Sequence, residues 1–202
     1  MRLRINRELA LLLTIAVASA SSALAHAQAA PPTESAARPE VALDYTYVHS
    51  NAPQGGCGCF NMNGGNATFA WPLGSGKLAL AGDITIAHAG TVSTSGDNLT
   101  FSTFTAGVRY LPPMKSRSFQ PFGQVLLGLA HSSGTLVQGA NPGAANAGAA
   151  FAGSFGGGLD LRVNPRFSIR LVEADYLLTT FDNGTNNHQN NLRISAGLVI
   201  HF

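Results

Sequence analysis

"NLRISAGLVIHF" occupies residues 191–202 and alternates between two kinds of side chain. Apolar residues take every second position, namely Leu192, Ile194, Ala196, Leu198, Ile200 and Phe202. The positions between them are mostly small or charged. A period of two residues is typical of a strand that presents a different face to each side of a sheet. The segment therefore predicts a β-strand with one large apolar face.

The same two-residue period recurs throughout the chain after residue 40. Eight segments show it, at residues 41–49, 67–72, 78–87, 102–110, 124–130, 151–162, 167–181 and 191–202. Short connections alternate with long ones, and the short ones are residues 73–77, 111–118 and 163–166. Short turns on one side and longer loops on the other are typical of membrane barrels. We therefore predict an all-β fold, an eight-stranded antiparallel up-and-down transmembrane β-barrel.

The composition favours a barrel whose outer face meets lipid. Charged residues make up 11% of the chain, whereas a soluble domain usually has about 25%. A soluble ligand-binding barrel keeps its large apolar side chains inside and would carry Lys and Glu outside. Here Lys occurs only in short connections, at Lys77 and Lys115. We therefore expect the large apolar face to point outward and the small or charged face to line the lumen.

The first residues have the pattern of a secretory signal peptide. Arg2, Arg4 and Arg7 precede an apolar run, and "ALA" and "AHA" follow it as small-x-small cleavage sites. We predict a signal peptide at residues 1–27, a disordered lead-in at 28–39 and a barrel at 40–202. Nine basic and nine acidic residues follow residue 27, so no basic surface for nucleic acid is expected.

Charged residues on the inward face should form an ion-pair network that plugs the lumen, because buried charges are tolerated only when they are paired. A narrow polar channel is the alternative. In residues 167–181 the alternation changes phase near residues 172–173, which predicts a β-bulge there. The expected network consists of Asp44, Asp83, Asp160, Glu173, Asp175, Arg109, Arg162, Arg170 and Arg193.

Two further groups could suggest a metal site, but simpler interpretations account for both. Cys57 and Cys59 are separated by one residue, which favours a local disulfide in an oxidising compartment and lacks the paired spacing of a zinc site. His49, His88 and His131 share the phase of the outward-facing residues. We therefore expect no metal and no cofactor.

The signal peptide, the eight alternating segments and the closing "RISAGLVIHF" together resemble small bacterial outer-membrane β-barrel proteins, of the outer-membrane protein A, opacity-protein and porin-like type. The resemblance covers residues 40–202. It implies a cell outer membrane of the Gram-negative type, with both mature termini in the periplasm. It also implies that Phe202, preceded by Ile200 and Leu198, is the signal read by the barrel-assembly machinery.

The resemblance leaves the biological role to the loops. We expect a non-enzymatic barrel with a structural or surface-interaction role, surrounded by outer-membrane lipid and lipopolysaccharide, with an extracellular ligand as a further candidate partner. The alternative is an enzyme that modifies outer-leaflet lipid, because some barrels of this kind deacylate lipid A with a His-x-Ser pair and a nearby Glu. His131 and Ser133 have that spacing, but no acidic residue occurs between Asp97 and Asp160.

Overall fold

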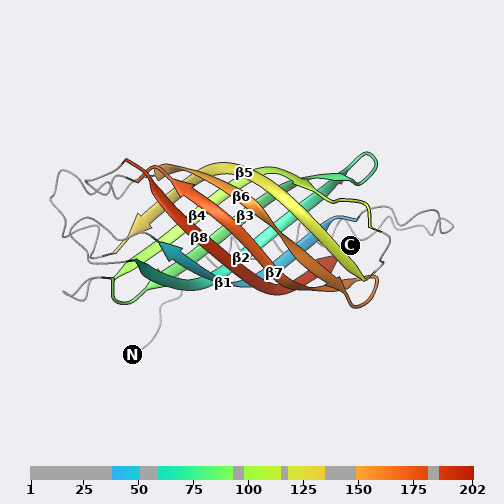
Figure 1. The fold of residues 1–202 in the computed structure, drawn as a ribbon, viewed down its shortest axis with the longest axis horizontal. Coiled ribbons are helices and arrows are strands. Elements are labelled where there is room, and N and C mark those ends of the chain that lie inside the picture. The colour runs from blue at the N-terminus through green and yellow to red at the C-terminus, as the bar shows by residue number, and fades with distance from the viewer. Residues whose placement is uncertain (1–37, 51–58, 93–97, 115–117, 135–148, 182–186) are drawn as a thin grey trace, which may run out of the picture. The chain divides into compact units, whose positions relative to one another are not determined.

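The computed structural model describes residues 38–50, 59–92, 98–114, 118–134, 149–181 and 187–202. Eight strands are found there, and each pairs antiparallel with the next along the chain. The last strand also pairs with the first, with Leu43 opposite Leu198 and Tyr45 opposite Ala196, so the sheet closes (Figure 1). The predicted eight-stranded barrel is therefore confirmed. Its strands are β1 (Glu40–Ser50), β2 (Phe60–Leu73), β3 (Leu78–Ala89), β4 (Leu99–Tyr110), β5 (Phe119–Ser133), β6 (Ala149–Arg162), β7 (Phe167–Thr179) and β8 (Gln189–His201).

The barrel has two unlike ends. Residues 74–77, 111–118 and 163–166 connect strands at one end, called here the turn end, and β1 begins and β8 ends there. The first turn is tight, since Gly74 and Gly76 adopt φ angles of 49° and 73° and the Gly76 amide donates to the Leu73 carbonyl at 2.9 Å. Such φ values favour glycine over residues with a side chain. The other end, called the loop end, holds the longer connections.

The two faces of the sheet are sorted as the alternation predicted. Large apolar side chains on the outer face are 40–62% exposed, among them Leu43, Tyr45, Leu80, Phe104, Leu129 and Leu198. The inner face holds the buried polar and charged side chains together with small residues. A water-soluble protein would arrange these faces the other way round. Within the described ranges, the structure contains no helix of the length and apolar character needed to cross a bilayer.

Two strands begin five or more residues before their predicted starts. β2 begins at Phe60, whereas the predicted segment begins at residue 67. In the additional part of the strand, Phe60 and Met62 point inward while Asn61 and Asn63 point outward. This apolar-in, polar-out alternation is the reverse of the alternation in the middle of the strands, and it also occurs at the start of β4, where Leu99 and Phe101 are buried. β5 begins at Phe119 rather than at residue 124, in a stretch where Pro121 interrupts the pattern.

The predicted bulge in β7 is confirmed and lies one residue earlier. Leu159 pairs with Val172 and Asp160 with Arg170, so Leu171 is the extra residue. Leu171 and Val172 are both exposed, and the alternation restarts with Glu173 inward. The bulge therefore brings Arg170 and Glu173 to the same face although they are three residues apart.

Residues 1–37 lie outside the described ranges. The signal peptide and all but the last two residues of the predicted lead-in therefore stay predictions.

Candidate functional site

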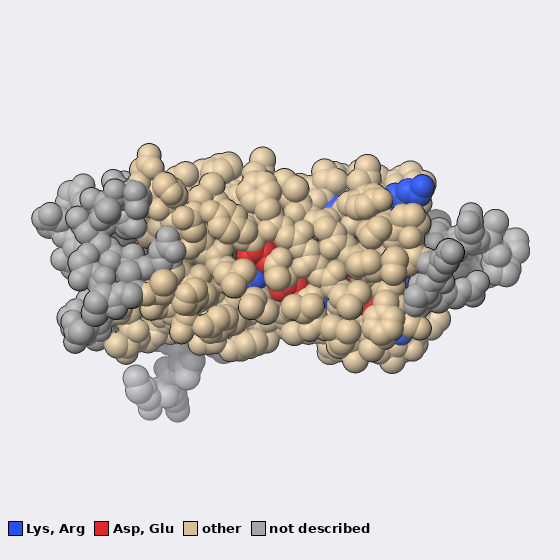
Figure 2. All heavy atoms as spheres, in the orientation of Figure 1, with Lys and Arg blue, Asp and Glu red and all other residues tan. Residues whose placement is uncertain are grey.

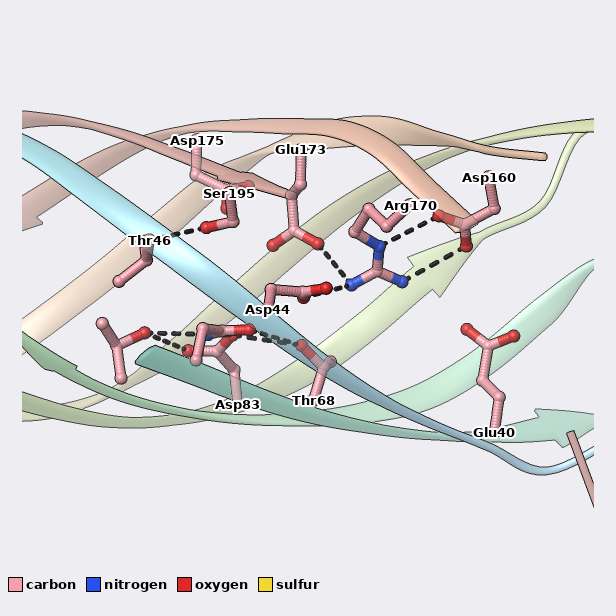
Figure 3. Close-up of polar contacts among 12 residues, drawn as sticks. Glu40, Asp44, Thr46, Thr68, Asp83, Asp160, Arg170, Glu173, Asp175 and Ser195 are labelled. Atoms are coloured by element: carbon pink, nitrogen blue, oxygen red, sulfur yellow. Dashed lines mark hydrogen bonds and ion pairs between the residues drawn. The ribbon is translucent and has the colours of Figure 1, made fainter. Parts of the chain in front are cut away.

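Arg170 on β7 is fully buried inside the barrel and is surrounded by carboxylates. Its Nη1 lies 2.7 Å from Glu173 Oε2 and 3.1 Å from Asp44 Oδ2, and its Nε lies 3.0 Å from Asp160 Oδ1. Figure 3 shows these carboxylates converging on the guanidinium from β1, β6 and β7. One cation thus links three strands and neutralises charges that would otherwise be costly to bury.

Arg193 on β8 forms a second cluster. Its Nη2 lies 2.6 Å from Asp175 Oδ2 and 3.2 Å from Glu173 Oε1, and its Nη1 lies 2.7 Å from Asp83 Oδ1. Glu173 therefore uses one oxygen for Arg193 and the other for Arg170. This shared carboxylate joins the two clusters.

Arg109 on β4 connects to the same network through a neutral side chain. Its Nη1 lies 2.7 Å from Glu40 Oε1, while its Nε and Nη2 donate to Gln124 Oε1 at 3.1 and 2.8 Å. Gln124 Nε2 in turn donates to Glu173 Oε1 at 3.0 Å. Neither Glu40 nor Gln124 was among the network residues predicted from the sequence. Glu40 lies one residue before the first predicted segment. Gln124 has the phase of the inward-facing residues, and that phase could have indicated its place in the network.

An aromatic ring also lies within the network. The guanidinium carbons of Arg109 and Arg170 lie 4.2 and 4.7 Å from the centroid of the Phe122 ring, within range of a favourable cation–π interaction. Phe122 pairs with Gly158 on β6, where a Cβ atom would lie 2.7 Å from the ring. Glycine at this position therefore makes room for the ring.

The network holds more acids than arginines. Three buried arginines face six buried carboxylates, Glu40, Asp44, Asp83, Asp160, Glu173 and Asp175. Neutral donors supply further hydrogen bonds, as when Thr85 Oγ1 donates to Asp83 Oδ1 at 3.1 Å. Buried polar groups are stable when such bonds are made. Ion pairs and hydrogen bonds thus join the three arginines, the six acids and Gln124 into one network, within which Asp44 Oδ1 has no hydrogen-bond partner.

The structure brings together eight of the nine predicted network residues and places the ninth elsewhere. Arg162 is the last residue of β6 and is exposed, and it forms no ion pair within the described ranges. Arg162 lies opposite buried Ser168, so its position in the strand has the predicted inward phase. The strand ends there, however, and the side chain reaches solvent at the turn end.

A second, apolar layer, which was not predicted from the sequence, lies inside the barrel toward the loop end. Its members come from the seven strands β1 to β7 and are at most 8% exposed. Short polar links border it, including a bond from Ser50 Oγ to Asn191 Oδ1 between β1 and β8. The buried members are Val48, Phe60, Met62, Ala87, Ala89, Leu99, Phe101, Ala130, Ala152 and Leu177. We call these residues the apolar seal.

The predicted disulfide and the predicted assembly signal lie at or beyond the ends of the described ranges. Cys59 is exposed just before β2, and Cys57 lies outside the described residues, so their disulfide stays a prediction. Phe202 and Leu198 are 57% and 58% exposed on the outer face, and Ile200 is half-buried. Their role in assembly likewise stays a prediction.

His131 and Ser133 both lie on the outer face at the loop end of β5. Their register partners are Ser102 and Thr100 on β4, with Ala149 on β6, and none of these is acidic. Among the residues that the structure describes, no group of three or more metal-ligating side chains is close enough to hold an ion.

Comparison with known proteins finds the same architecture. A family model described as "Outer membrane protein beta-barrel domain" matches residues 11–202. The chain is similar to the crystal structure of Neisserial surface protein A, with a TM-score of 0.59 and 16% identity over 81% of this chain and 97% of that one. It is also similar to the crystal structure of Ail, the attachment invasion locus protein of Yersinia pestis, with a TM-score of 0.51 and 17% identity over 82% and 99% of the two chains. No curated protein matches by sequence.

Proposed function

The chain belongs to the outer membrane protein beta-barrel domain family, and on that premise we propose that it is a closed, non-enzymatic barrel of the outer membrane with a structural or surface-interaction role. In this proposal the turn end and both mature termini face the periplasm. The loop end faces the exterior, where lipopolysaccharide surrounds it and an extracellular ligand could contact the loops. The barrel-assembly machinery would recognise Phe202.

The observation that carries the proposal is the burial of charged and apolar side chains on the inner face of the barrel. Arg170 and Arg193 are at most 1% exposed as side chains, and each contacts three carboxylates. The apolar seal adds a second barrier, because an ion would have to leave water to pass it. A barrel of eight strands is narrow enough for side chains alone to fill it. Function would then lie on the outside of the barrel.

Planar-bilayer recording of the refolded, purified chain tests the closed lumen. We expect no stable, large channels under conditions in which an open porin, inserted as the positive control, conducts. Stable, large channels formed by the chain would contradict the plugged barrel and favour the porin alternative.

The geometry around His131 and Ser133 supports a non-enzymatic role, because the register partners supply no carboxylate to act with the imidazole. Mass spectrometry of lipid A from cells with and without the chain tests this point. We expect identical acyl chains. A change that disappears in His131→Ala would instead establish the lipid-modifying enzyme.

A further inference from the structure

Exposed basic side chains gather at the turn end of the barrel. Arg38, Lys77, Arg162 and Arg166 are all exposed, and they precede β1, precede β3, end β6 and precede β7, respectively. None of the four forms an ion pair with another described residue. We call these four residues the basic collar.

The acids near the collar do not neutralise it. Glu40 and Asp160 are the carboxylates at this end of the described strands, and both are buried and paired, with Arg109 and Arg170. The loop end differs, since the described residues there carry no exposed Lys, Arg, Asp or Glu. Figure 2 shows a wall with only small charged patches between its ends, with Lys and Arg at the right-hand end. Among the described residues, the exposed positive charge therefore lies at one end.

The collar lies directly beside the apolar outer face. Lys77, Arg162 and Arg166 are each followed by an exposed apolar residue, and these residues, Leu78, Val163 and Phe167, are 46%, 60% and 45% exposed. Exposed aromatic side chains occur at the same end, among them Trp71, Tyr110, Phe119 and Phe202. Aromatic girdles mark the level where hydrocarbon meets headgroups. The basic groups therefore stand at headgroup depth.

Backbone hydrogen bonds fix this position. The Lys77 carbonyl accepts from the Leu111 amide at 2.8 Å, the Arg166 carbonyl accepts from His201 at 2.8 Å, and the Arg162 amide donates to Ser118 at 2.7 Å. The backbone of Lys77, Arg162 and Arg166 is therefore fixed at the turn end. Their side chains can reach further while their stems stay against apolar surface.

We propose that the basic collar binds anionic phospholipid headgroups of the leaflet at the turn end. Phosphate at headgroup depth matches both the sign of the collar and its level, and arginine can bind phosphate through two parallel hydrogen bonds. Which leaflet this is rests on the orientation in the proposed function, where it is the periplasmic one. The binding itself does not depend on that orientation.

The test uses the full barrel, refolded into vesicles of phosphatidylethanolamine with phosphatidylglycerol. The barrel is extracted mildly with its bound lipid, and mass spectrometry measures the enrichment of phosphatidylglycerol over the bulk vesicle. The variant carries Arg38→Gln, Lys77→Gln, Arg162→Gln and Arg166→Gln. We expect wild type to enrich phosphatidylglycerol and the variant to lose at least about tenfold of that enrichment, since four basic residues are removed and each contributes severalfold near an anionic surface.

The matched control exchanges the basic residues without changing their charge, as Arg38→Lys, Lys77→Arg, Arg162→Lys and Arg166→Lys, and should keep most of the enrichment. A second control replaces His49, His88 and His131 by Gln at the loop end and should change nothing. Heat-modifiable gel migration confirms that every variant is folded. Bilayer conductance of the same samples reports separately on the closed lumen.

Two outcomes would overturn the proposal. The first is equal enrichment of phosphatidylglycerol by wild type and the glutamine variant. The second is no enrichment by wild type together with binding to purified peptidoglycan that the glutamine variant loses, which would assign the collar to the cell wall.

Discussion

At the scale of single residues, Glu173 and the arginines that it joins explain why this interior tolerates so much charge. Each oxygen of Glu173 contacts a different guanidinium, and Gln124 links the pair to Arg109. Because Arg170, Arg193 and Glu173 each have two or more charged partners, removal of any of them takes a partner from several other groups. The loss in free energy of unfolding on substitution therefore depends on how many partners lose a hydrogen bond or ion pair.

Arg193→Met should be strongly destabilising, because it leaves Asp83 and Asp175 without a cationic partner and leaves Glu173 with only one. Removing one partner of a buried ion pair typically costs about 3–5 kcal/mol. Urea unfolding in lipid vesicles, followed by fluorescence of the single tryptophan, Trp71, measures the free energy. Arg166→Met is the control, since this exposed residue forms no ion pair within the described ranges, and should cost less than about 1 kcal/mol. Equal losses would show that the interior network contributes little.

At the scale of elements, the bulge in β7 is what keeps the charges inside. Before it, Arg170 points inward, and after it, Glu173 and Asp175 do so. A regular strand would turn Glu173 toward lipid if Arg170 stayed inward. The bulge could be predicted from the sequence because charged side chains must point away from lipid, so Arg170, Glu173 and Asp175 indicate the inward face. It placed the bulge one residue late because Leu171 and Val172 are both apolar.

Single-residue deletions in β7 test this interpretation. Removing Val172 takes out the bulge and leaves Arg170, Glu173 and Asp175 inward, so we expect the protein to fold. Removing Ala174 forces Glu173 or Asp175 to face hydrocarbon, which is costly, so we expect folding to fail. Heat-modifiable gel migration of the refolded proteins reports both results. Efficient folding of both deletions would show that the phase of β7 does not decide where the charges lie.

The end of β8 should matter for assembly more than for stability. Phe202 follows the last residue of β8, is 57% exposed, and is held by a bond from its amide to the Pro39 carbonyl at 3.0 Å. Its deletion removes little buried surface, so the free energy of unfolding should change by less than about 1 kcal/mol. Outer-membrane levels in cells should fall clearly. Unchanged levels at high expression would count against an assembly signal.

Some strand boundaries could not be predicted, for a physical reason. In a membrane barrel, a period of two residues identifies a strand only where the apolar side chains point outward and the polar or small ones point inward. Phe60 and Met62 point into the apolar seal, so the start of β2 shows the pattern of a soluble sheet. Glu40 and Gln124 were missed because pairing across the lumen depends on strand register and tilt, which one sequence does not show.

At the scale of the whole molecule, charge is divided between two places with different access to water. The interior network is enclosed by the wall and the apolar seal, whereas the basic collar is exposed. Salt screens exposed charges strongly and buried pairs much less. One change of ionic strength should therefore separate the two populations of charge.

Raising salt to about 1 M, where the screening length falls to about 3 Å, should abolish most of the enrichment of phosphatidylglycerol around wild type. The free energy of unfolding in phosphatidylethanolamine vesicles should stay nearly constant, because Arg170 and Arg193 keep their partners away from water. Urea titrations in the phosphatidylethanolamine vesicles measure the free energy of unfolding, and lipid mass spectrometry in the mixed vesicles measures the enrichment at the same salt concentrations. The glutamine variant of the collar should unfold with the same weak salt dependence as wild type. A steep loss of stability with salt in both proteins would mean that water and ions reach the interior pairs, and the closed barrel would have to be abandoned.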